Sequence, residues 1–452
     1  MQDYPADFVE LIRKKFGDES DDFLTAIQHA AQSSIRINPT KWKAEFQLGP
    51  WSEVPWYSKG YTYKDRPSYI IDPAFHAGAY YVQESSSMFI GHVLQSIKSK
   101  LPTGAIVLDL CAAPGGKSTL LLDEIGNDAI LVANETIKAR SLVLKENIMK
   151  WGRNNCVVTN MDPKEIGERN TRFDLILVDA PCSGEGLFRK DPQASTEWSL
   201  DNVALCAARQ NRIVDDILPV LADGGYLIYS TCTYNDEENI KNVLNWQKKF
   251  DLESVKIDVP GHWGVTISSL EDAEGYHFYP HKVSGEGFFC AVLQKSGTND
   301  VSNIQHSKSQ LQQPDKQQNE AINQFVKRES LRLIHKNGDV YHYNEALGHK
   351  IHDFLAEYRL IYSGIKCGNL NKTLFIPDHA LALSEIIQSN IPKHQLEIEE
   401  ARAYLRRNLQ SINNPTKSWM LIQYQDLNLG WIKNLGNRIN NYFPQELRIR
   451  NA

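Results

Sequence analysis

The fold is decided by residues 105–118, which read AIVLDLCAAPGGKS. Residues 105–110 form an apolar run with the composition of a buried strand. Small residues follow, and a helix is expected over residues 117–125. Small residues let backbone amides approach a ligand, and the beginning of a helix presents its positive end to that ligand. The stretch therefore predicts a strand, a ligand-binding loop and a helix in succession.

Strands and helices keep alternating after this unit. Further strands are expected at residues 130–134, 156–159, 173–178 and 226–229, with helices at 137–150 and 206–221. Such a series folds into a parallel sheet with crossover helices. We therefore predict an α/β fold over residues 99–295, a Rossmann-like domain of the class I methyltransferase kind or a close relative of it.

The rest of the chain divides by composition. Residues 1–98 indicate a smaller N-terminal α+β segment, with short helices before aromatic-rich irregular structure. Residues 296–325 are rich in Gln, Ser and Asn, have little to bury, and are expected to be a flexible linker. Residues 326–452 are expected to be a C-terminal region with 17 Lys and Arg against 12 Asp and Glu. That balance is compatible with RNA binding but is also common in proteins that bind no nucleic acid.

The composition indicates the class of protein and the cellular compartment. The 452 residues are 42% hydrophobic and carry a net charge of −6, as in an ordinary globular protein. No apolar run reaches the ~18 residues of a membrane span, and residues 1–7 do not have the pattern of a signal peptide. The seven cysteines are widely spaced with no Cys-x-x-Cys pair. That spacing predicts reduced thiols in the cytoplasm and no metal site.

The loop after residue 110 is neither a P-loop nor a dinucleotide-binding loop, since both glycine patterns are absent. Acidic residues follow three consecutive strands: Glu135, Asp162 and Asp179. An acid at the end of the second strand is placed to accept hydrogen bonds from ribose hydroxyls. Each acid alone is more often a helix N-cap. Together they favour a nucleoside with a cationic sulfonium, S-adenosylmethionine, over a nucleotide polyphosphate.

Two cysteines, Cys182 and Cys232, come just after expected strands. Ligands bind outside the carboxyl ends of such strands, so both thiols can face one base. A thiolate that adds to carbon 6 of cytosine makes carbon 5 able to take a methyl group, and a second thiol can serve product release. Buried structural cysteine is the usual alternative. Pro181, Gly184 and Gly186 favour an irregular loop instead, and Lys117 could lower a thiol pKa if it lies close.

Several longer segments resemble the RNA 5-methylcytosine methyltransferases of the NSUN type, the RsmB/RsmF family. They are residues 111–117 (CAAPGGK), 179–186 (DAPCSGEG), 230–233 (STCT), 81–88 (YVQESSSM), 285–289 (GEGFF) and 36–38 (RIN). The segments occur in order over about residues 30–295. The resemblance implies a Rossmann-like methyltransferase domain that uses S-adenosylmethionine and acts on RNA.

The resemblance also implies a role for each matching residue. Cys232 would attack carbon 6, and Cys182 would promote release of the product. Asp179 and Lys117 would lie in the active site beside cofactor and base. The cofactor would be held by Cys111, Ala112, Ala113, Pro114, Gly115, Gly116, Lys117, Glu135, Asp162 and Asp179. DNA cytosine methyltransferases take their nucleophile from a Pro-Cys segment, and by that analogy Cys182 would attack instead.

The tail is similar to the RsmF-like 16S rRNA methyltransferases within that family, over residues 396–407 and 430–444. The resemblance implies a PUA-like RNA-binding module in residues 326–452 and an N-terminal RNA-binding or substrate segment in residues 1–98. It also implies 16S rRNA as the partner, free or in the small ribosomal subunit, and a cytoplasmic, monomeric protein that does not bind membranes.

Individual tail residues suit RNA contact but have ordinary alternatives. Arg402, Arg406 and Arg407 have the spacing of one helix face and could contact phosphates, or form a solvated surface. Trp431 and Tyr442 could stack on bases, although core packing is commoner.

Three other functions stay open at this point. The same chemistry could act on tRNA. A non-catalytic RNA-binding assembly factor on a methyltransferase scaffold would not need Cys182, Cys232, Lys117 and Asp179 together. A small-molecule methyltransferase would leave the second thiol and the tail unexplained.

Overall fold

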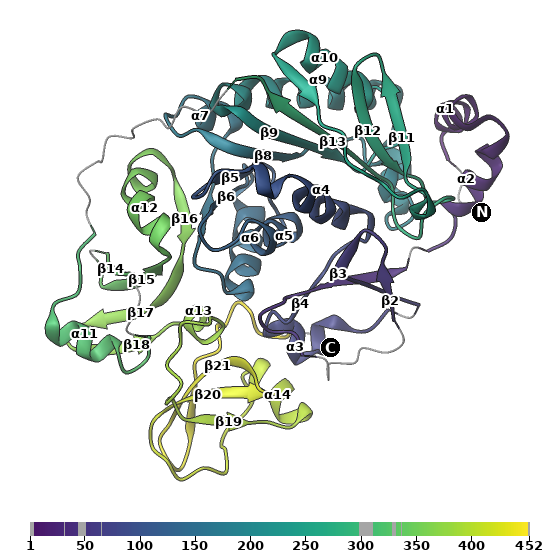
Figure 1. Ribbon diagram of the computed structural model, residues 1–452. Coiled ribbons are helices and arrows are strands. Elements are labelled where there is room, and N and C mark those ends of the chain that lie inside the picture. Colours follow the sequence, from purple (N-terminus) through teal and green to yellow (C-terminus); the bar gives the residue numbers. More distant parts are fainter. Residues whose placement is uncertain are drawn as a thin grey trace.

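A mixed β-sheet lies at the centre of the computed structural model, which describes residues 4–30, 32–43, 51–64, 66–297, 311–327, 331–335 and 337–450 (Figure 1). Its strand order is β11-β12-β13-β9-β8-β5-β6-β7-β16, with β10 paired to β13. The parallel strands are β5 (Ile106–Asp109), β6 (Ile130–Asn134), β7 (Cys156–Thr159), β8 (Phe173–Asp179) and β9 (Leu221–Thr231). These are the five strands that the sequence predicts.

Helices cover both faces of this sheet because its strands alternate apolar side chains to the two sides. Val107 packs with one cluster and Leu108 with the other. One face carries α4 (Phe89–Ile97), α5 (Gly116–Glu124) and α6 (Lys138–Trp151). The other carries α9 (Leu200–Ile217), α10 (Ile240–Lys249) and α12 (Glu345–Glu357), with the short helices α7 (Pro163–Gly167) and α8 (Pro192–Glu197) in the connections. The Rossmann-like α/β prediction is confirmed.

Antiparallel strands extend the sheet at both edges, beyond what the sequence predicts. Four of them, β10 (Leu252–Ser254), β11 (Thr266–Leu270), β12 (Ala273–Phe278) and β13 (Phe288–Lys295), lie beyond β9. At the far edge β16 (Leu360–Ser363), from the C-terminal region, pairs with β7. The helix expected at 206–221 ends earlier, and β9 begins at Leu221 because Gly224, with φ of 74°, lets the chain turn within the strand.

The N-terminal segment is a small α+β unit, as predicted. Its elements are α1 (Ala6–Phe16), α2 (Ser20–Ala26), β1 (Ser33–Ile37), β2 (Trp51–Val54), β3 (Tyr57–Tyr63), α3 (Pro73–His76) and β4 (Tyr80–Val82). The strands form one antiparallel sheet in the order β2-β3-β1-β4.

A buried arginine, Arg36, fastens this segment to the catalytic domain. Its side chain and that of Asp123 on α5 are fully buried, with Nη1 2.6 Å from Oδ2. Its Nη2 donates to the carbonyl of Gly116 at 3.3 Å and to Thr119, and the guanidinium stacks 4.4 Å from the Trp151 ring. A buried ion pair tolerates its desolvation only when its hydrogen bonds are satisfied in this way.

The C-terminal region contains two further four-stranded sheets (Figure 1). The first comprises β14 (Leu331–Ile334), β15 (Asp339–Tyr343), β17 (Ile365–Asn371) and β18 (Leu374–Pro377). The second comprises β19 (Lys393–Gln395), β20 (Trp419–Tyr424), β21 (Leu427–Asn434) and β22 (Ile439–Asn441), with α13 (His379–Ala382) and α14 (Ile398–Leu405). No helix among the described residues is long and apolar enough to cross a membrane.

The expected linker over 296–325 differs from the structure in its last third. Residues 298–310 lie outside the described residues, but α11 (Lys316–Ile322) is a helix. Asp315 and Gln318 form a capping box at its start, and Ile322 is fully buried. The few apolar residues of this Gln-rich stretch are spaced to pack on a neighbouring sheet, which composition alone does not reveal.

Most of the tail residues that the sequence suggested for RNA contact instead bind or pack against other parts of the protein. Arg402 donates from Nε to the Ile71 carbonyl at 3.1 Å, and Arg407 donates to the Phe443 carbonyl. Trp431 is fully buried. Tyr442 remains 37% exposed and is still available to a ligand.

Replacing Arg36 with Met should destabilise the protein by about 3–5 kcal/mol, because it leaves the Asp123 carboxylate buried without its main partner. The free energy of unfolding, from urea denaturation, measures this change. The exposed Arg13 offers a control, and Arg13→Met should change that value by no more than about 0.5 kcal/mol. Equal effects of the two substitutions would contradict the fastening role of Arg36.

Candidate active site

The loop between β5 and α5 has a conformation that its small residues make possible. Gly115 has φ of 115°, a region that side chains other than glycine rarely adopt. Helix α6 holds the loop from outside: Arg140 donates to the Ala113 carbonyl at 2.9 Å and Asn147 to the Pro114 carbonyl at 2.8 Å. The backbone of the loop is therefore fixed beside the first turn of α5.

A cavity of about 200 Å³ lies against this loop. Residues 81–84 and Ser87 of the N-terminal segment line one side. The other side is lined by the predicted site residues Cys111, Ala112, Ala113, Pro114, Gly116, Lys117 and Asp179. The tertiary structure thus brings the predicted loop and the acid at the end of β8 to one cavity.

Asp109, which ends β5 beneath the loop, is a candidate site residue that the sequence pattern did not reveal. Its side chain is fully buried, and burial raises its pKa to about 7. Ser118 donates to Oδ2 at 2.6 Å, while Oδ1 has no hydrogen-bond partner among the described residues. An orphaned carboxyl oxygen next to a glycine-rich loop fits a ligand with donors to offer, as a nucleoside with an amino group has.

The two outer acids lie on the same edge of the sheet but do not line this cavity. Glu135 is buried, accepts from the Ile137 amide at 2.8 Å and lies 3.7 Å from Arg140. Asp162 is exposed and caps α7 in a capping box with Glu165. A part for Glu135 and Asp162 in holding the cofactor stays a prediction.

Lys117 and Asp179 form an ion pair in the cavity, with Nζ 2.8 Å from Oδ2. Ser230 donates to the other carboxylate oxygen at 2.8 Å, and the Phe288 ring lies 5.5 Å from the ammonium. Burial disfavours the charge on Lys117, but the Asp179 carboxylate more than offsets this, so the pKa of Lys117 is raised. The pair places a cation and an anion where a polar ring would enter.

The two cysteines meet. Cys182 follows β8, Cys232 follows β9, and their Sγ atoms are 3.2 Å apart as free thiols. Hydrogen bonding to Cys232 and burial raise the pKa of Cys182 well above its usual value. Cys182 therefore keeps its proton at neutral pH and can donate it to the Cys232 sulfur.

A fully buried carboxylate, Glu238, holds the two cysteine loops together. Its oxygens accept from the Ser183 amide at 3.0 Å and from the Ser183 hydroxyl. They also accept from Gln210 at 2.8 Å and from Asn235 at 2.8 Å. Each donor satisfies part of the cost of burying the charge, and together they fix the chain on both sides of the thiols.

A second buried carboxylate, Glu185, works in the same way. It accepts from the Tyr234 amide at 2.6 Å, from the Asn235 amide at 3.0 Å and from Trp198 at 3.0 Å. The amide of Gly186 donates to the Cys232 carbonyl at 2.7 Å, an approach that a Cβ at this position would block. Glu185 lies within a motif that the sequence already indicated, whereas nothing in the sequence distinguishes Glu238 from its acidic neighbours Asp236 and Glu237.

The N-terminal segment closes the site from the opposite side. Glu84 accepts from the Ser86 amide at 2.7 Å and from the Glu286 amide at 2.8 Å. Glu286 itself is buried 3.3 Å from Lys190 and 3.6 Å from Arg189. Two segments that resemble the family's motifs, 81–88 and 285–289, are thus joined to each other beside the thiols.

Three models of known protein families match separate parts of the chain. The model of 16S rRNA methyltransferase RsmB/F matches residues 99–294. The N-terminal domain of 16S rRNA methyltransferase RsmF matches residues 4–85, and the methyltransferase RsmF PUA domain matches residues 391–449.

Individual relatives agree with these matches. The ribosomal RNA small subunit methyltransferase F of Vibrio cholerae serotype O1 is 30% identical, over 98% of this chain and 97% of that one. The protein of the same name from Escherichia coli O127:H6 is 30% identical, over 94% and 92%.

Among solved structures, a methyltransferase homologue from Pyrococcus horikoshii is similar at a TM-score of 0.56 and 27% identity, over 65% of this chain and 95% of that one. NSun6 from the same organism, solved with the ligand SFG, has a TM-score of 0.56 at 21% identity, over 66% and 100%, and shares the fold.

The fold and the cavity beside the glycine loop are those of a Rossmann-like methyltransferase, and the match to the RsmB/F methyltransferases indicates S-adenosylmethionine as its methyl donor. Within this class, the chain belongs to the RsmB/F family of 16S rRNA methyltransferases, and its N-terminal and PUA domains are those of RsmF.

Replacing Glu238 with Gln should destabilise the protein by about 1–3 kcal/mol, because an amide nitrogen would face donors that now bind a carboxylate oxygen. Thermal and urea unfolding measure the loss. Its neighbour Glu237 is exposed and pairs only with Lys241 at the surface, so Glu237→Gln should cost at most about 0.5 kcal/mol. If both variants unfold like the wild type, Glu238 does not hold the loops.

Asp109 should make stability fall as pH rises from 4 to 7. An unfolded aspartate has a pKa of about 3.9, whereas burial raises that of Asp109 to about 7. Between these values the native state keeps a proton that the unfolded state has lost, so its stability decreases with pH. The difference in unfolding free energy between Asp109→Asn and wild type should therefore grow from pH 4 to 7 and then level off. With the exposed Asp128→Asn no such growth is expected, and a flat difference for Asp109→Asn would refute the assignment.

Proposed function

We propose that this protein methylates carbon 5 of a cytosine in 16S rRNA through a covalent bond between Cys232 and carbon 6 of the base. The observation that carries the proposal is the meeting of two free thiols, 3.2 Å apart, at the ends of adjacent parallel strands. Methyl transfer to a nitrogen or oxygen needs no such pair, whereas carbon 5 of cytosine is a poor nucleophile until a thiolate has added to carbon 6.

The cofactor site is supported by the cavity along the 111–117 loop and by the unpartnered oxygen of Asp109. Bound there, S-adenosylmethionine supplies an electrophilic methyl group next to the ion pair of Lys117 and Asp179. The loop amides, Asp109 and the predicted residues Glu135 and Asp162 would hold its nucleoside.

The chain's own residues would activate the cytosine for methyl transfer. The thiolate of Cys232 forms a bond to carbon 6, and electron density moves to carbon 5. Lys117 and Asp179, held together and to Ser230, face ring nitrogen 3, and a proton passed from the Lys117 ammonium by way of Asp179 neutralises the negative charge that builds there.

Cys182 would act at the end of the reaction. As the bond between carbon 6 and the Cys232 sulfur breaks, Cys182 passes its own proton to that sulfur, takes the carbon 5 proton in return and exchanges it with solvent. Because its pKa is raised, Cys182 holds a proton that it can donate in a hydrogen bond to the departing sulfur. Its removal would therefore trap the adduct rather than prevent it.

The substrate follows from the relatives and the C-terminal modules. The relatives that match almost the whole chain are named for the ribosomal RNA of the small subunit, and the PUA domain match covers residues 391–449. We place the reaction in the cytoplasm, on free 16S rRNA or the assembling subunit, with one copy of the chain per RNA.

An adduct that survives denaturing electrophoresis tests the mechanism. Wild type, Cys182→Ala and Cys232→Ala are incubated with labelled S-adenosylmethionine and either deproteinised 16S rRNA, tRNA or small subunits. Cys182→Ala should accumulate a protein–RNA species, and Cys232→Ala should lose methyl transfer by at least about a hundredfold and form none. Cys206→Ala, a buried helical thiol outside the site, should behave as wild type.

The other outcomes are equally informative. An adduct with Cys232→Ala alone would make Cys182 the nucleophile. Product on tRNA and none on 16S rRNA would change the substrate. No transfer and no adduct with any RNA would leave an RNA-binding factor without catalysis.

A further inference from the structure

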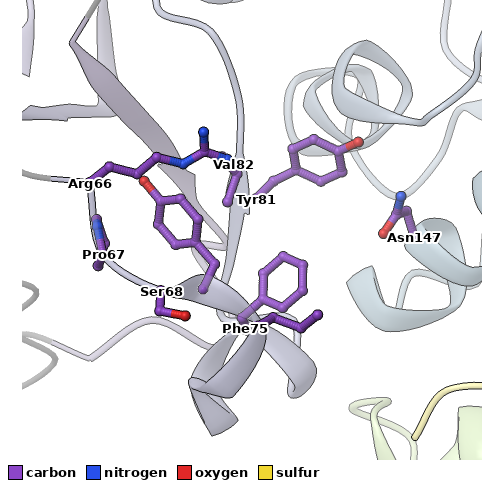
Figure 2. A pocket seen from close by; sticks show the side chains of 9 residues that line it. Arg66, Pro67, Ser68, Phe75, Tyr81, Val82 and Asn147 are labelled. Atoms are coloured by element: carbon purple, nitrogen blue, oxygen red, sulfur yellow. The ribbon is translucent and has the colours of Figure 1, made fainter. Parts of the chain in front are cut away.

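A second cavity, of about 480 Å³, lies next to the first (Figure 2). Tyr81 and Val82 line both cavities. The rest of its wall comes from the loop and short helix over residues 66–75 and from Asn147 on α6. We call it the aromatic pocket.

The lining of the aromatic pocket has a distinct chemistry. Tyr69, Phe75 and Tyr81 supply three rings, and Arg66 supplies an exposed cation. None of the described residues that line it carries a carboxylate. Figure 2 shows the rings of Phe75 and Tyr81 between Arg66 on one side and Asn147 on the other. Flat rings beside a guanidinium suit a nucleobase and its phosphate, since every base has a face that stacks.

The pocket is continuous with the cofactor loop. Asn147, on its far wall, donates to the Pro114 carbonyl of that loop at 2.8 Å. A Cβ on Gly116 would lie 3.2 Å from the Tyr81 ring, so the ring packs directly on the loop. A polynucleotide that brings one base to the Lys117–Asp179 pair, which lines the first cavity, would also pass the aromatic pocket, because the two cavities share Tyr81 and Val82.

We propose that the aromatic pocket binds the base of a nucleotide next to the target cytosine, in the same single strand of RNA. The base stacks between Phe75 and Tyr81, and Arg66 contacts a flanking phosphate. That the nucleotide beside the bound one is the target cytosine rests on the proposed function. That the pocket binds single-stranded RNA does not rest on it. No described residue of the lining carries a carboxylate to receive ribose hydroxyls, which favours RNA over the nucleoside of the cofactor as occupant.

Three variants probe the pocket with a fluorescein-labelled, mixed-sequence single-stranded RNA of 12 nucleotides, by fluorescence anisotropy. Phe75→Leu should raise the Kd about 5- to 100-fold without changing its dependence on salt. Arg66→Ala should reduce the slope of log K against log salt by about 1. Ser68→Asp, at an exposed lining residue, should weaken binding without disturbing the fold. Phe250→Leu and Arg212→Ala, at the end of α10 and on α9, are the matched controls and should bind as wild type.

Methyl transfer supplies a second, separate readout. The same three variants should raise the KM for 16S rRNA by a similar factor, with the affinity for S-adenosylmethionine and kcat near wild type. Unchanged RNA affinity in all three, while wild type methylates RNA, would overturn the proposal.

Other results would assign the pocket to another ligand or reject the proposed function. Weaker cofactor binding with unchanged RNA binding would assign the pocket to the cofactor, and a defect only on assembled subunits would assign it to a protein partner. Both overturn the proposal. Weakened RNA binding in a protein whose wild type transfers no methyl group would support the pocket and reject the proposed function.

Discussion

Two buried carboxylates, Glu185 and Glu238, set the geometry on which the site depends. A buried charge is tolerated only when enough donors surround it, and here backbone amides and side-chain amides from the loops after β8 and β9 provide them. Each loop alone would leave donors and acceptors unpaired. In the arrangement that satisfies both carboxylates, the thiols of Cys182 and Cys232 lie 3.2 Å apart.

The N-terminal segment contributes directly to the candidate active site. Arg36 ties its sheet to α5, and Glu84 receives the Glu286 amide beside the thiols. Residues 81–84 then line the cavity beside the 111–117 loop, and Tyr81 also lines the aromatic pocket. The surface that would receive RNA is therefore assembled from two domains and has its shape only when both are folded together.

The C-terminal region is also joined to the catalytic sheet. Strand β16 pairs with β7 at the edge of that sheet, and α12 packs on the face that carries α9 and α10 (Figure 1). Several of its candidate RNA contacts turned out to be structural, since Arg402 and Arg407 bind backbone carbonyls. Binding by this region would then rest on groups such as Tyr442 that stay exposed.

The sequence by itself determined the five parallel strands, the helices between them and the glycine loop, because these follow from periodicity and local backbone preference. The choice of Cys182, Cys232, Lys117 and Asp179 came from their positions around the strand ends and from the family resemblance. Only the tertiary structure decided the 3.2 Å between the thiols, the raised pKa of Asp109 and the burial of Glu238. It also placed a helix in a Gln-rich segment and buried Trp431. Each of these depends on removal of water and on partners from distant segments, and a local pattern contains neither.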